Sequence, residues 1–277
     1  MNKKAYRYPV VLTIAGFDGI GGAGIQGDIK TISALGCYAT SVLTALPVQN
    51  TRGVRSVYPI PADVVGAQLQ VILDDVFPDA IKIGMVHTAE VVEVIVNTLQ
   101  QYREVPVVFD PVMVSTSGQR LLEDSTVETV VKKLFPLAGV VTPNLDEAAV
   151  LTGMPIHTVD DMRVAGKKIM AMGPRSVLLK GGHLDATQLT SLYFTKDGEI
   201  QEFSFEKIDT PNTRGTGCAL SSAMASYIAR GSSLPDAVAQ AQEYVHQAIL
   251  NGKDVQMGKG NGPLNHFFDP QKLIINE

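Results

Sequence analysis

Short, continuous apolar runs alternate along the chain with longer segments in which apolar residues recur at every third or fourth position. In segment 63–76, for example, Val65, Leu69 and Ile72 fall on one face of a helix. The short runs predict strands, and the periodic segments predict helices. The predicted strands are 10–15, 38–44, 80–83, 106–109, 140–142 and 176–179, and the predicted helices are 25–35, 63–76, 91–99, 127–134, 146–151, 159–172, 219–229 and 234–250.

The order of these elements predicts the architecture. Apolar strands that alternate with helices are typical of a parallel sheet that is covered on both faces. Residues 189–195 and 199–205 flank the turn Lys196-Asp197-Gly198, which indicates a hairpin. Because we see no internal repeat or low-complexity linker, we expect a single α/β domain over residues 1–277, with a loop and a short ordered piece after Gly252.

Composition narrows the classes of function. The chain has 23 Lys and Arg against 28 Asp and Glu, a net charge of −5, and it lacks the basic runs that a nucleic-acid partner favours. The apolar run 10–15 is too short for a signal sequence or a membrane span. Two cysteines, Cys37 and Cys218, cannot form a disulfide scaffold for a chain of this size, which indicates a reducing compartment. We therefore expect a cytoplasmic protein with a small-molecule ligand and no membrane partner.

Five glycines lie in loop 15–24, which follows the first strand and opens the first helix. The spacing from Gly19 to Gly24 matches the dinucleotide fingerprint G-x-G-x-x-G, but residues 41–45 offer no acid to hold a ribose, which argues against a dehydrogenase. No P-loop motif occurs in the chain. The glycines let the backbone approach a ligand closely. Asp28 either points a carboxylate into the same space or is a solvated helix residue.

A second glycine-rich loop, residues 212–218, precedes an apolar helix. Gly215 and Gly217 let consecutive N–H groups turn toward one point, and the helix start adds partial positive charge, so the loop favours an anion. The same field predicts a lowered pKa for the thiol of Cys218, although a small buried cysteine is the alternative interpretation. For Cys37 the core interpretation is preferred.

Polar side chains follow several predicted strands at the point where each strand ends. Asp110, Asn144, Glu147 and Lys180 occupy such positions, where open α/β sheets bind their ligands. Two carboxylates and a lysine suit Mg²⁺ and a polyphosphate, so the sequence predicts a phosphoryl-transfer site. His183 is interpreted as a loop residue without a role.

A set of motifs runs in one order from about Val10 to Gly262-Pro263. The motifs are Ala15-Gly16-x-Asp18, Gly21-Gly22-Ala23-Gly24-Ile25-Gln26-x-Asp28, Thr44-Ala45, Gln49-Asn50-Thr51, Lys82-Ile83-Gly84-Met85, Asp110-Pro111-Val112-Met113, Thr142-Pro143-Asn144, Glu147-Ala148, Lys180-Gly181-Gly182-His183 and Gly215-Thr216-Gly217-Cys218. In this order they resemble the hydroxymethylpyrimidine/phosphomethylpyrimidine kinases of thiamine synthesis, a branch of the ribokinase-like superfamily.

The resemblance implies a ribokinase-like fold, with a mostly parallel central sheet between helices. It implies an enzyme that uses ATP and Mg²⁺ to phosphorylate 4-amino-5-hydroxymethyl-2-methylpyrimidine and then its monophosphate, and that forms a homodimer. The residues that it assigns to the pyrimidine pocket are Gly16, Asp28, Gln49, Met85 and Val112. Asp28 and Gln49 would hydrogen-bond the ring, and Met85 and Val112 would pack on its faces.

The resemblance also assigns the phosphate end of the site. Asp110 and Glu147 would organise Mg²⁺, and Cys218 would take the place of the aspartate base of most of the superfamily. Lys180 would bridge the transferring phosphoryl group and contact ATP. The other groups near the ATP phosphates would be Thr142, Asn144 and Arg214, and the backbone N–H groups of the anion hole would be those of Gly215, Thr216 and Gly217.

Three departures from the family pattern affect the choice of substrate. Phe17 replaces a small polar residue, with Gly19-Ile20 in place of a serine-rich pair; Pro47-Val48 precedes Gln49; and Arg214 stands where histidine is common. The first two affect the ring pocket and leave open a pyridoxal or pyridoxine kinase, which would share this fold. A non-catalytic ligand sensor on a kinase fold is the alternative from a different class.

Overall fold

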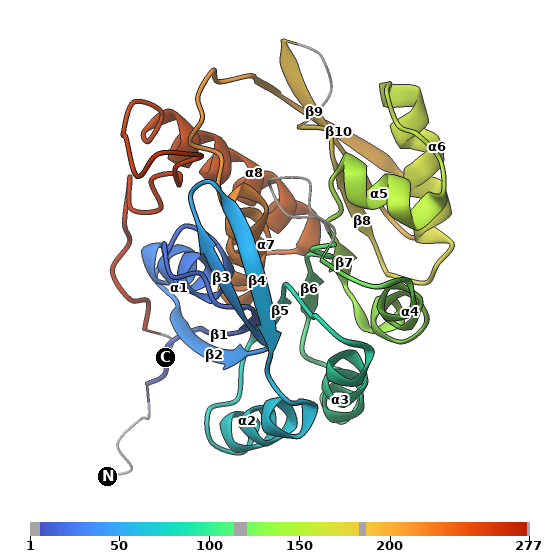
Figure 1. Cartoon of the computed structure of the whole chain (residues 1–277), viewed down its shortest axis with the longest axis vertical. Coiled ribbons are helices and arrows are strands. Elements are labelled where there is room, and N and C mark those ends of the chain that lie inside the picture. Colours follow the sequence, from blue (N-terminus) through green and yellow to red (C-terminus); the bar gives the residue numbers. More distant parts are fainter. Residues whose placement is uncertain (1–5, 114–120, 183–186, 276–277) are drawn as a thin grey trace.

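An eight-stranded sheet forms the centre of the residues that the computed structural model describes, which are 6–113, 121–182 and 187–275 (Figure 1). Its strands are β1 (Val10–Ala15), β2 (Tyr38–Leu43), β5 (Ala80–Ile83), β6 (Val107–Phe109), β7 (Val140–Val141), β8 (Val177–Lys180), β9 (Gln188–Phe194) and β10 (Ile200–Glu206). They are ordered β10-β9-β8-β7-β6-β5-β1-β2. The six strands from β2 to β8 are parallel, and β9 pairs antiparallel with both β8 and β10. The predicted mostly parallel sheet and the predicted hairpin are both confirmed.

Helices cover both faces of this sheet, as predicted (Figure 1). Successive side chains of a strand point to opposite faces, so Val11 of β1 packs in one core and Leu12 in the other. The core that contains Val11 is closed by α1 (Gly24–Ala34), α7 (Thr216–Ala229) and α8 (Leu234–Leu250). The core that contains Leu12 is closed by α2 (Ala62–Asp75), α3 (Ala89–Leu99), α5 (Leu145–Thr152), α6 (Val159–Met170) and the turns 130–137 that follow α4 (Asp124–Thr129).

Most element ends lie within one to three residues of their predicted positions. The largest local difference follows α4, where the chain continues as a π-helical turn, Val130–Leu134, and a 3₁₀ turn, Phe135–Leu137. Pro136 lacks a backbone N–H group and so cannot continue an α-helix, which explains the irregular end.

The sequence pattern missed a two-stranded antiparallel sheet made of β3 (Ala45–Asn50) and β4 (Gly53–Pro59). This hairpin stands apart from the main sheet and leans toward α7 and α8 (Figure 1). Pro47 inside β3 argues against a strand in sequence analysis, because proline cannot donate to the ladder. The pairing survives because β3 has no third strand as a neighbour in this small sheet.

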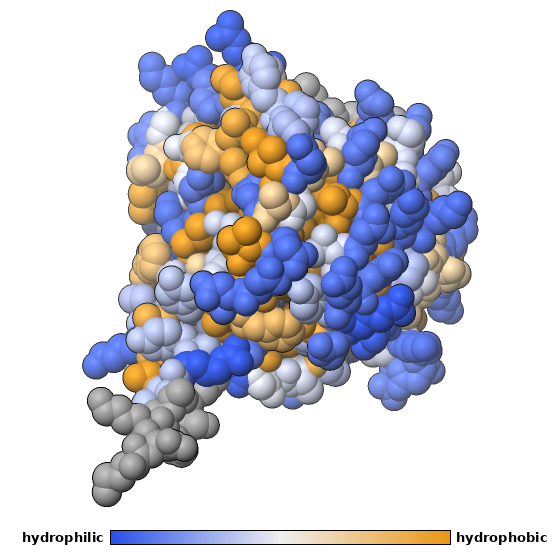
Figure 2. Space-filling view, turned by 90° about the horizontal axis from the view of Figure 1, so that it is seen from below, coloured by the Kyte–Doolittle hydropathy of each residue, from blue (hydrophilic) through white to orange (hydrophobic). Residues whose placement is uncertain are grey.

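Among the described residues, no helix has the length and apolar character needed to cross a bilayer. On the face seen from below, apolar residues are interspersed with hydrophilic ones (Figure 2).

A test of the packing uses Gly166 of α6, which lies directly against the ring of Phe194. A Cβ atom at Gly166 would lie 2.2 Å from ring atoms of Phe194. We expect Gly166→Ala to lower the free energy of unfolding by about 1–3 kcal/mol through overpacking, as measured by urea denaturation. Val164→Ala on the same helix is the control, because Val164 is 49% exposed and its truncation should change stability by less than about 0.5 kcal/mol. Equal stabilities of the two variants would contradict the close packing.

Candidate active site

A cavity of about 700 Å³ opens at the carboxyl edge of the parallel strands. Both glycine-rich loops contribute to its wall, together with the β3–β4 hairpin, the strand ends and one face of α8. Of the residues implied for the pyrimidine pocket, those that line this cavity are Gly16, Gln49, Met85 and Val112. Phosphate-end residues on the same wall are Asp110, Asn144, Glu147, Lys180, Arg214, Gly215, Thr216, Gly217 and Cys218. The structure thus brings the two predicted halves of the site into one cavity.

The strand-end cluster forms as predicted around Asp110, which follows β6. Lys180 Nζ at the end of β8 lies 2.9 Å from Asp110 Oδ1. The hydroxyl of Thr142 donates to the same oxygen at 3.0 Å, so Thr142 reaches a ligand only through Asp110. Burial alone would lower the pKa of Lys180, but attraction to Asp110 and Glu147 outweighs it and the pKa is raised. Lys180 is therefore a permanent cation at the cavity wall.

Asn144 and Glu147 hold each other in a capping box at the start of α5. The N–H of Asn144 donates to Glu147 Oε2 at 2.8 Å, and the N–H of Glu147 donates to Asn144 Oδ1 at 2.9 Å. Burial raises the pKa of Glu147 to about 7; Lys180 opposes this shift and the Asp110 carboxylate adds to it. Both protonation states of Glu147 are therefore populated near neutral pH, and a bound cation would favour the ionised carboxylate.

Both glycines of the second glycine-rich loop lie in close contact with their surroundings, and at Gly215 the contact leaves no room for a side chain. Gly215 is the N-cap of α7 with φ of +83°, and a Cβ atom there would lie 1.8 Å from the carbonyl oxygen of Gly22. A Cβ atom at Gly217 would lie 3.1 Å from Lys180 Nζ and 3.3 Å from Asp110 Oδ2. The bare backbone of Gly217 therefore stands beside the Lys180–Asp110 pair, as an anion hole requires. The N–H of Thr216 already donates to the carbonyl of Thr213 at 3.3 Å.

The prediction of a lowered pKa for Cys218 is wrong. Cys218 lies in the first turn of α7, and although the residue as a whole is partly exposed, burial of its thiol raises the pKa to about 11. The ammonium of Lys82 opposes this shift, whereas Asp28 and Asp110 strengthen it. The partial charge at the helix start is too weak to outweigh burial between two carboxylates. Cys37 is a core residue, as predicted, and is 1% exposed.

Asp28 requires a correction, because the structure places it beneath the cavity rather than in the ring pocket. Its side chain is fully buried, and both oxygens bind Lys82 Nζ, at 2.8 and 2.9 Å. Hydroxyl groups of Thr13 and Ser222 donate to the same carboxylate at 2.6 and 2.8 Å. A carboxylate with these donors has neither the access nor the free lone pairs for a pyrimidine ring. The alternative of a solvated helix residue is equally wrong.

Arg214 also has a partner that the sequence did not reveal. Its Nη2 lies 3.0 Å from Asp18 Oδ1, and its Nε lies 3.3 Å from Asp18 Oδ2. The N–H groups of Gly22 and Ala23 donate to the same Asp18 side chain at 3.2 and 2.8 Å. Asp18 thus clamps the first glycine-rich loop to the second. In this clamp the guanidinium of Arg214 is already paired with Asp18, so its charge is only partly available to ATP. An acid in one loop and a base in the other were the only sequence signals for it.

Sequence reasoning missed the residues that α8 and β4 contribute to the cavity. Val54 and Val57 of β4 lie near the ring pocket end, and Gln242 and His246 of α8 also line the wall. Gln242 is 7% exposed, and its amide nitrogen has no hydrogen-bond partner among the described residues. His183, which was interpreted as a loop residue without a role, lies outside the described residues.

Comparisons with known proteins show which family this chain belongs to. The profile of a family described as phosphomethylpyrimidine kinase matches residues 18–265. The chain is 46% identical over 257 residues to hydroxymethylpyrimidine/phosphomethylpyrimidine kinase of Escherichia coli, which covers 92% of this chain and 96% of that protein. The crystal structure of phosphomethylpyrimidine kinase from Clostridium difficile aligns with a TM-score of 0.76 at 42% identity, covering 87% of this chain and 99% of that one. Pyridoxal kinase from Staphylococcus aureus in complex with pyridoxal aligns with a TM-score of 0.86 at 34% identity, covering 94% of each chain.

The raised pKa of Glu147 predicts a pH-dependent stability. Its pKa rises from 4.5 to about 7 on folding, so the stability that its proton contributes is full below pH 4.5 and is lost as the pH rises through about 7. Glu147→Gln cannot titrate, so from pH 4.5 to 8 the wild type should lose up to about 3 kcal/mol of unfolding free energy relative to this variant.

Urea denaturation at both pH values, in buffer with a chelator, measures this difference. The matched control is Glu128→Gln, which makes the same chemical change at an exposed position and should follow the wild type. A Glu147→Gln variant whose stability parallels the wild type at both pH values would contradict the burial of a titrating carboxyl.

Proposed function

Because the chain belongs to the phosphomethylpyrimidine kinase family, we propose that it phosphorylates 4-amino-5-hydroxymethyl-2-methylpyrimidine and then its monophosphate in thiamine biosynthesis, with ATP as the donor. One observation carries the proposal: a single cavity is lined by the residues proposed to bind the ring, by the Lys180–Asp110 pair and by Gly217. A ring bound between Met85 and Val112 would have its hydroxymethyl group directed toward these charges. A kinase needs this juxtaposition of an acceptor and a phosphate-binding centre.

The ring end offers apolar walls and one amide. A Cβ atom at Gly16 would lie 3.3 Å from Met85 Sδ, so the absence of a side chain at Gly16 leaves room beside the thioether. Gln49 Nε2 donates to the carbonyl of Phe17 at 3.2 Å, which fixes the amide on the cavity wall. In the proposal Gln49 hydrogen-bonds the pyrimidine, while Met85 and Val112 pack on its faces.

The phosphate end supplies charge stabilisation. Lys180 and the backbone of Gly215 and Gly217 neutralise charge on the transferring phosphoryl group, which moves through a loose transition state. Mg²⁺, which assists phosphoryl transfer from ATP, is bound in such enzymes through one or two carboxylates and the substrate phosphates. Among the described residues no cluster of three or more His, Cys, Asp or Glu side chains that could hold a metal ion occurs. Asp110 and Glu147 would hold the ion, which supplies positive charge to the phosphate oxygens.

The remaining part of the cavity suits a nucleobase. Leu220, Val245 and Ile249 give it apolar walls. The amide nitrogen of Gln242, which has no hydrogen-bond partner within the described ranges, lies among them. An adenine ring combines apolar faces with hydrogen-bonding edges, so this region is the proposed site of the ATP base.

The proposal includes a homodimer and a reducing, cytoplasmic setting. Three apolar side chains of the β3–β4 hairpin, Leu46, Val48 and Tyr58, are 40%, 47% and 60% exposed, which supports a second copy as their cover. Cys37 and Cys218 are both free thiols, and a reducing compartment would keep the partly exposed Cys218 unoxidised.

A pyridoxal-type vitamin kinase is the second candidate, favoured by the TM-score of 0.86 to the Staphylococcus aureus pyridoxal kinase and by Phe17 at the ring pocket. The test is the kcat/KM of the purified full chain with ATP, measured for the hydroxymethylpyrimidine and for pyridoxal. We expect the pyrimidine to be the better substrate. A higher kcat/KM for pyridoxal would replace the proposal, and no product from either compound would favour a ligand sensor.

Cys218→Ala tests the proposed proton acceptor. We expect kcat to fall by about 10² to 10⁴, the usual contribution of a general base, while the affinity for the pyrimidine stays nearly unchanged. Steady-state kinetics and calorimetric titration measure the two quantities. Cys37→Ala is the matched control, because this cysteine lies in the core away from the cavity and its loss should leave kcat nearly unchanged. Near-normal turnover of Cys218→Ala would remove the thiol from the mechanism.

A further inference from the structure

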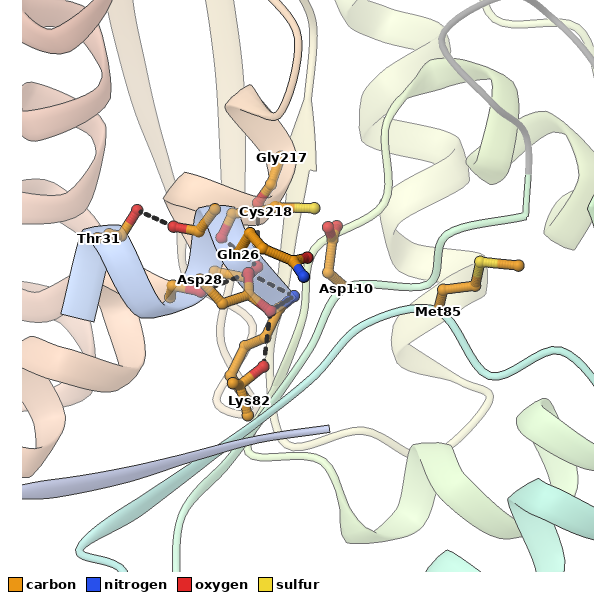
Figure 3. A network of polar contacts seen from close by, with 12 residues as sticks. Gln26, Asp28, Thr31, Lys82, Met85, Asp110, Gly217 and Cys218 are labelled. Carbon is orange, nitrogen blue, oxygen red and sulfur yellow. Dashed lines mark hydrogen bonds and ion pairs between the residues drawn. The ribbon is translucent and has the colours of Figure 1, made fainter. Parts of the chain in front are cut away.

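The proposed reaction leaves one buried cation without a role. Lys82 of β5 is fully buried, yet it contributes to the cavity wall. Figure 3 shows its ammonium between Asp28 on one side and Asp110 and Cys218 on the other, with Met85 farther away. Gly84 leaves the space for this ammonium, because a Cβ atom there would lie 2.6 Å from Lys82 Nζ.

Asp28 fixes the position of this ammonium. Its two oxygens lie 2.8 and 2.9 Å from Lys82 Nζ, and its remaining lone pairs accept from Thr13 and Ser222. Ser222 lies one helical turn beyond Cys218 on α7, so the carboxylate ties Lys82 to the helix that carries the thiol. The cation and the sulfur are therefore held on one rigid frame.

The hydrogen bonds of Lys82 are satisfied on one side only. An ammonium group has three N–H donors, and both acceptors that the described part of the chain gives Nζ belong to Asp28. Two donors serve those two oxygens, and the third has no acceptor within the part of the chain that the structure describes. Lys82 and Cys218 line the same cavity, so the positive charge and the sulfur lie on a common wall.

Stability alone does not account for this pair. Apolar residues of similar volume often replace a buried ion pair with no loss of stability, because the desolvation of two charges costs several kcal/mol. The charge environment of Cys218 supplies the better explanation. The groups that face it are Lys82 from β5, Asp28 and the Gly24 N–H from α1, and Asp110 after β6; of the three ionised groups only Lys82 favours a thiolate.

We propose that Lys82 is a positioning residue for Cys218, whose buried ammonium, fixed by Asp28, stabilises negative charge on the sulfur. The inference rests on the proposed function. In the reaction, the hydroxyl oxygen of the substrate bonds to the γ-phosphorus of ATP, and the bond from that phosphorus to the bridging oxygen of ADP breaks. The electron pair leaves with ADP, and the hydroxyl proton passes to Cys218 in its thiolate form, the minor form near neutral pH, whose population Lys82 increases.

The experiment compares Lys82→Met with the double variant Lys82→Met/Asp28→Asn. The single variant leaves an uncompensated buried carboxylate and is expected to be unstable. The double variant removes both charges and keeps the approximate volume, so it separates the loss of the cation from the loss of the fold. Thr13→Val is the matched control, because it removes a hydrogen bond to Asp28 without changing any charge.

Two readouts are measured for the double variant, the control and the wild type. The first is the pH midpoint of Cys218 alkylation by iodoacetamide, followed by peptide mass spectrometry, which needs no substrate and no turnover. The second is kcat and KM for the pyrimidine and ATP. We expect the midpoint of the double variant to rise by about half to one pH unit, because the cation outweighs the carboxylate at the sulfur. We expect kcat to fall at least about tenfold with KM changed less than about threefold, and Thr13→Val to match the wild type in both.

Three results would overturn the inference. The first is a double variant with an unmoved alkylation midpoint, whatever its activity. The second is a double variant that regains wild-type kcat, since the pair would then be only structural. The third is a Thr13→Val variant that shifts the midpoint as far as the double variant. Failure of the wild type to phosphorylate the pyrimidine would instead reject the proposed function, and the alkylation readout would still test the link between Lys82 and Cys218.

Discussion

Parallel strands end at the same edge of a sheet, and this constraint assembles the site. Asp110, Lys180 and Gly84 each lie at or just beyond the carboxyl end of a different strand, far apart in sequence. Strand pairing alone brings these ends within a few side-chain lengths of each other. The two helices that start beside this edge, α1 and α7, add the glycine-rich loops. The chemistry therefore depends on backbone pairing in the sheet more than on any single side-chain contact.

The same constraint explains what could be predicted from the sequence. Apolar runs and helical periodicity located the strands and helices of the main sheet, so the position of Asp110 beside Lys180 followed from topology. The pattern did not locate the β3–β4 hairpin, because Pro47 and exposed apolar residues interrupt the alternation of buried apolar and exposed polar residues that is typical of a strand. An element that packs on a ligand cavity rather than on a core carries a weak hydrophobic signal.

The other limit on prediction from the sequence was that the partners of buried ion pairs lie far apart along the chain. Lys82 lies 54 residues from Asp28, and Arg214 lies 196 residues from Asp18. Local sequence around Asp28 shows an acid near a glycine-rich loop, which is compatible with a ligand contact, a surface residue or a buried ion pair. The prediction for Cys218 failed for the same reason. It considered only the partial charge of the helix start, which lowers the pKa, whereas the folded chain raises it. Burial and two neighbouring carboxylates, which only the fold supplies, dominate at that sulfur.

The clamp between Asp18 and Arg214 joins the two glycine-rich loops into one wall of the cavity. The backbones of the two glycine-rich loops touch so closely that no side chain fits at Gly215, and Asp18 binds both loops through charge and through two N–H groups. Residues of both loops line the one cavity, so in the proposed function the same wall would contact the acceptor and the donor phosphates. A ligand that makes this wall more rigid reduces the conformational entropy that the protein loses when the second ligand binds. For the proposed function, we therefore expect the affinities for acceptor and nucleotide to be thermodynamically linked through the wall that both would contact.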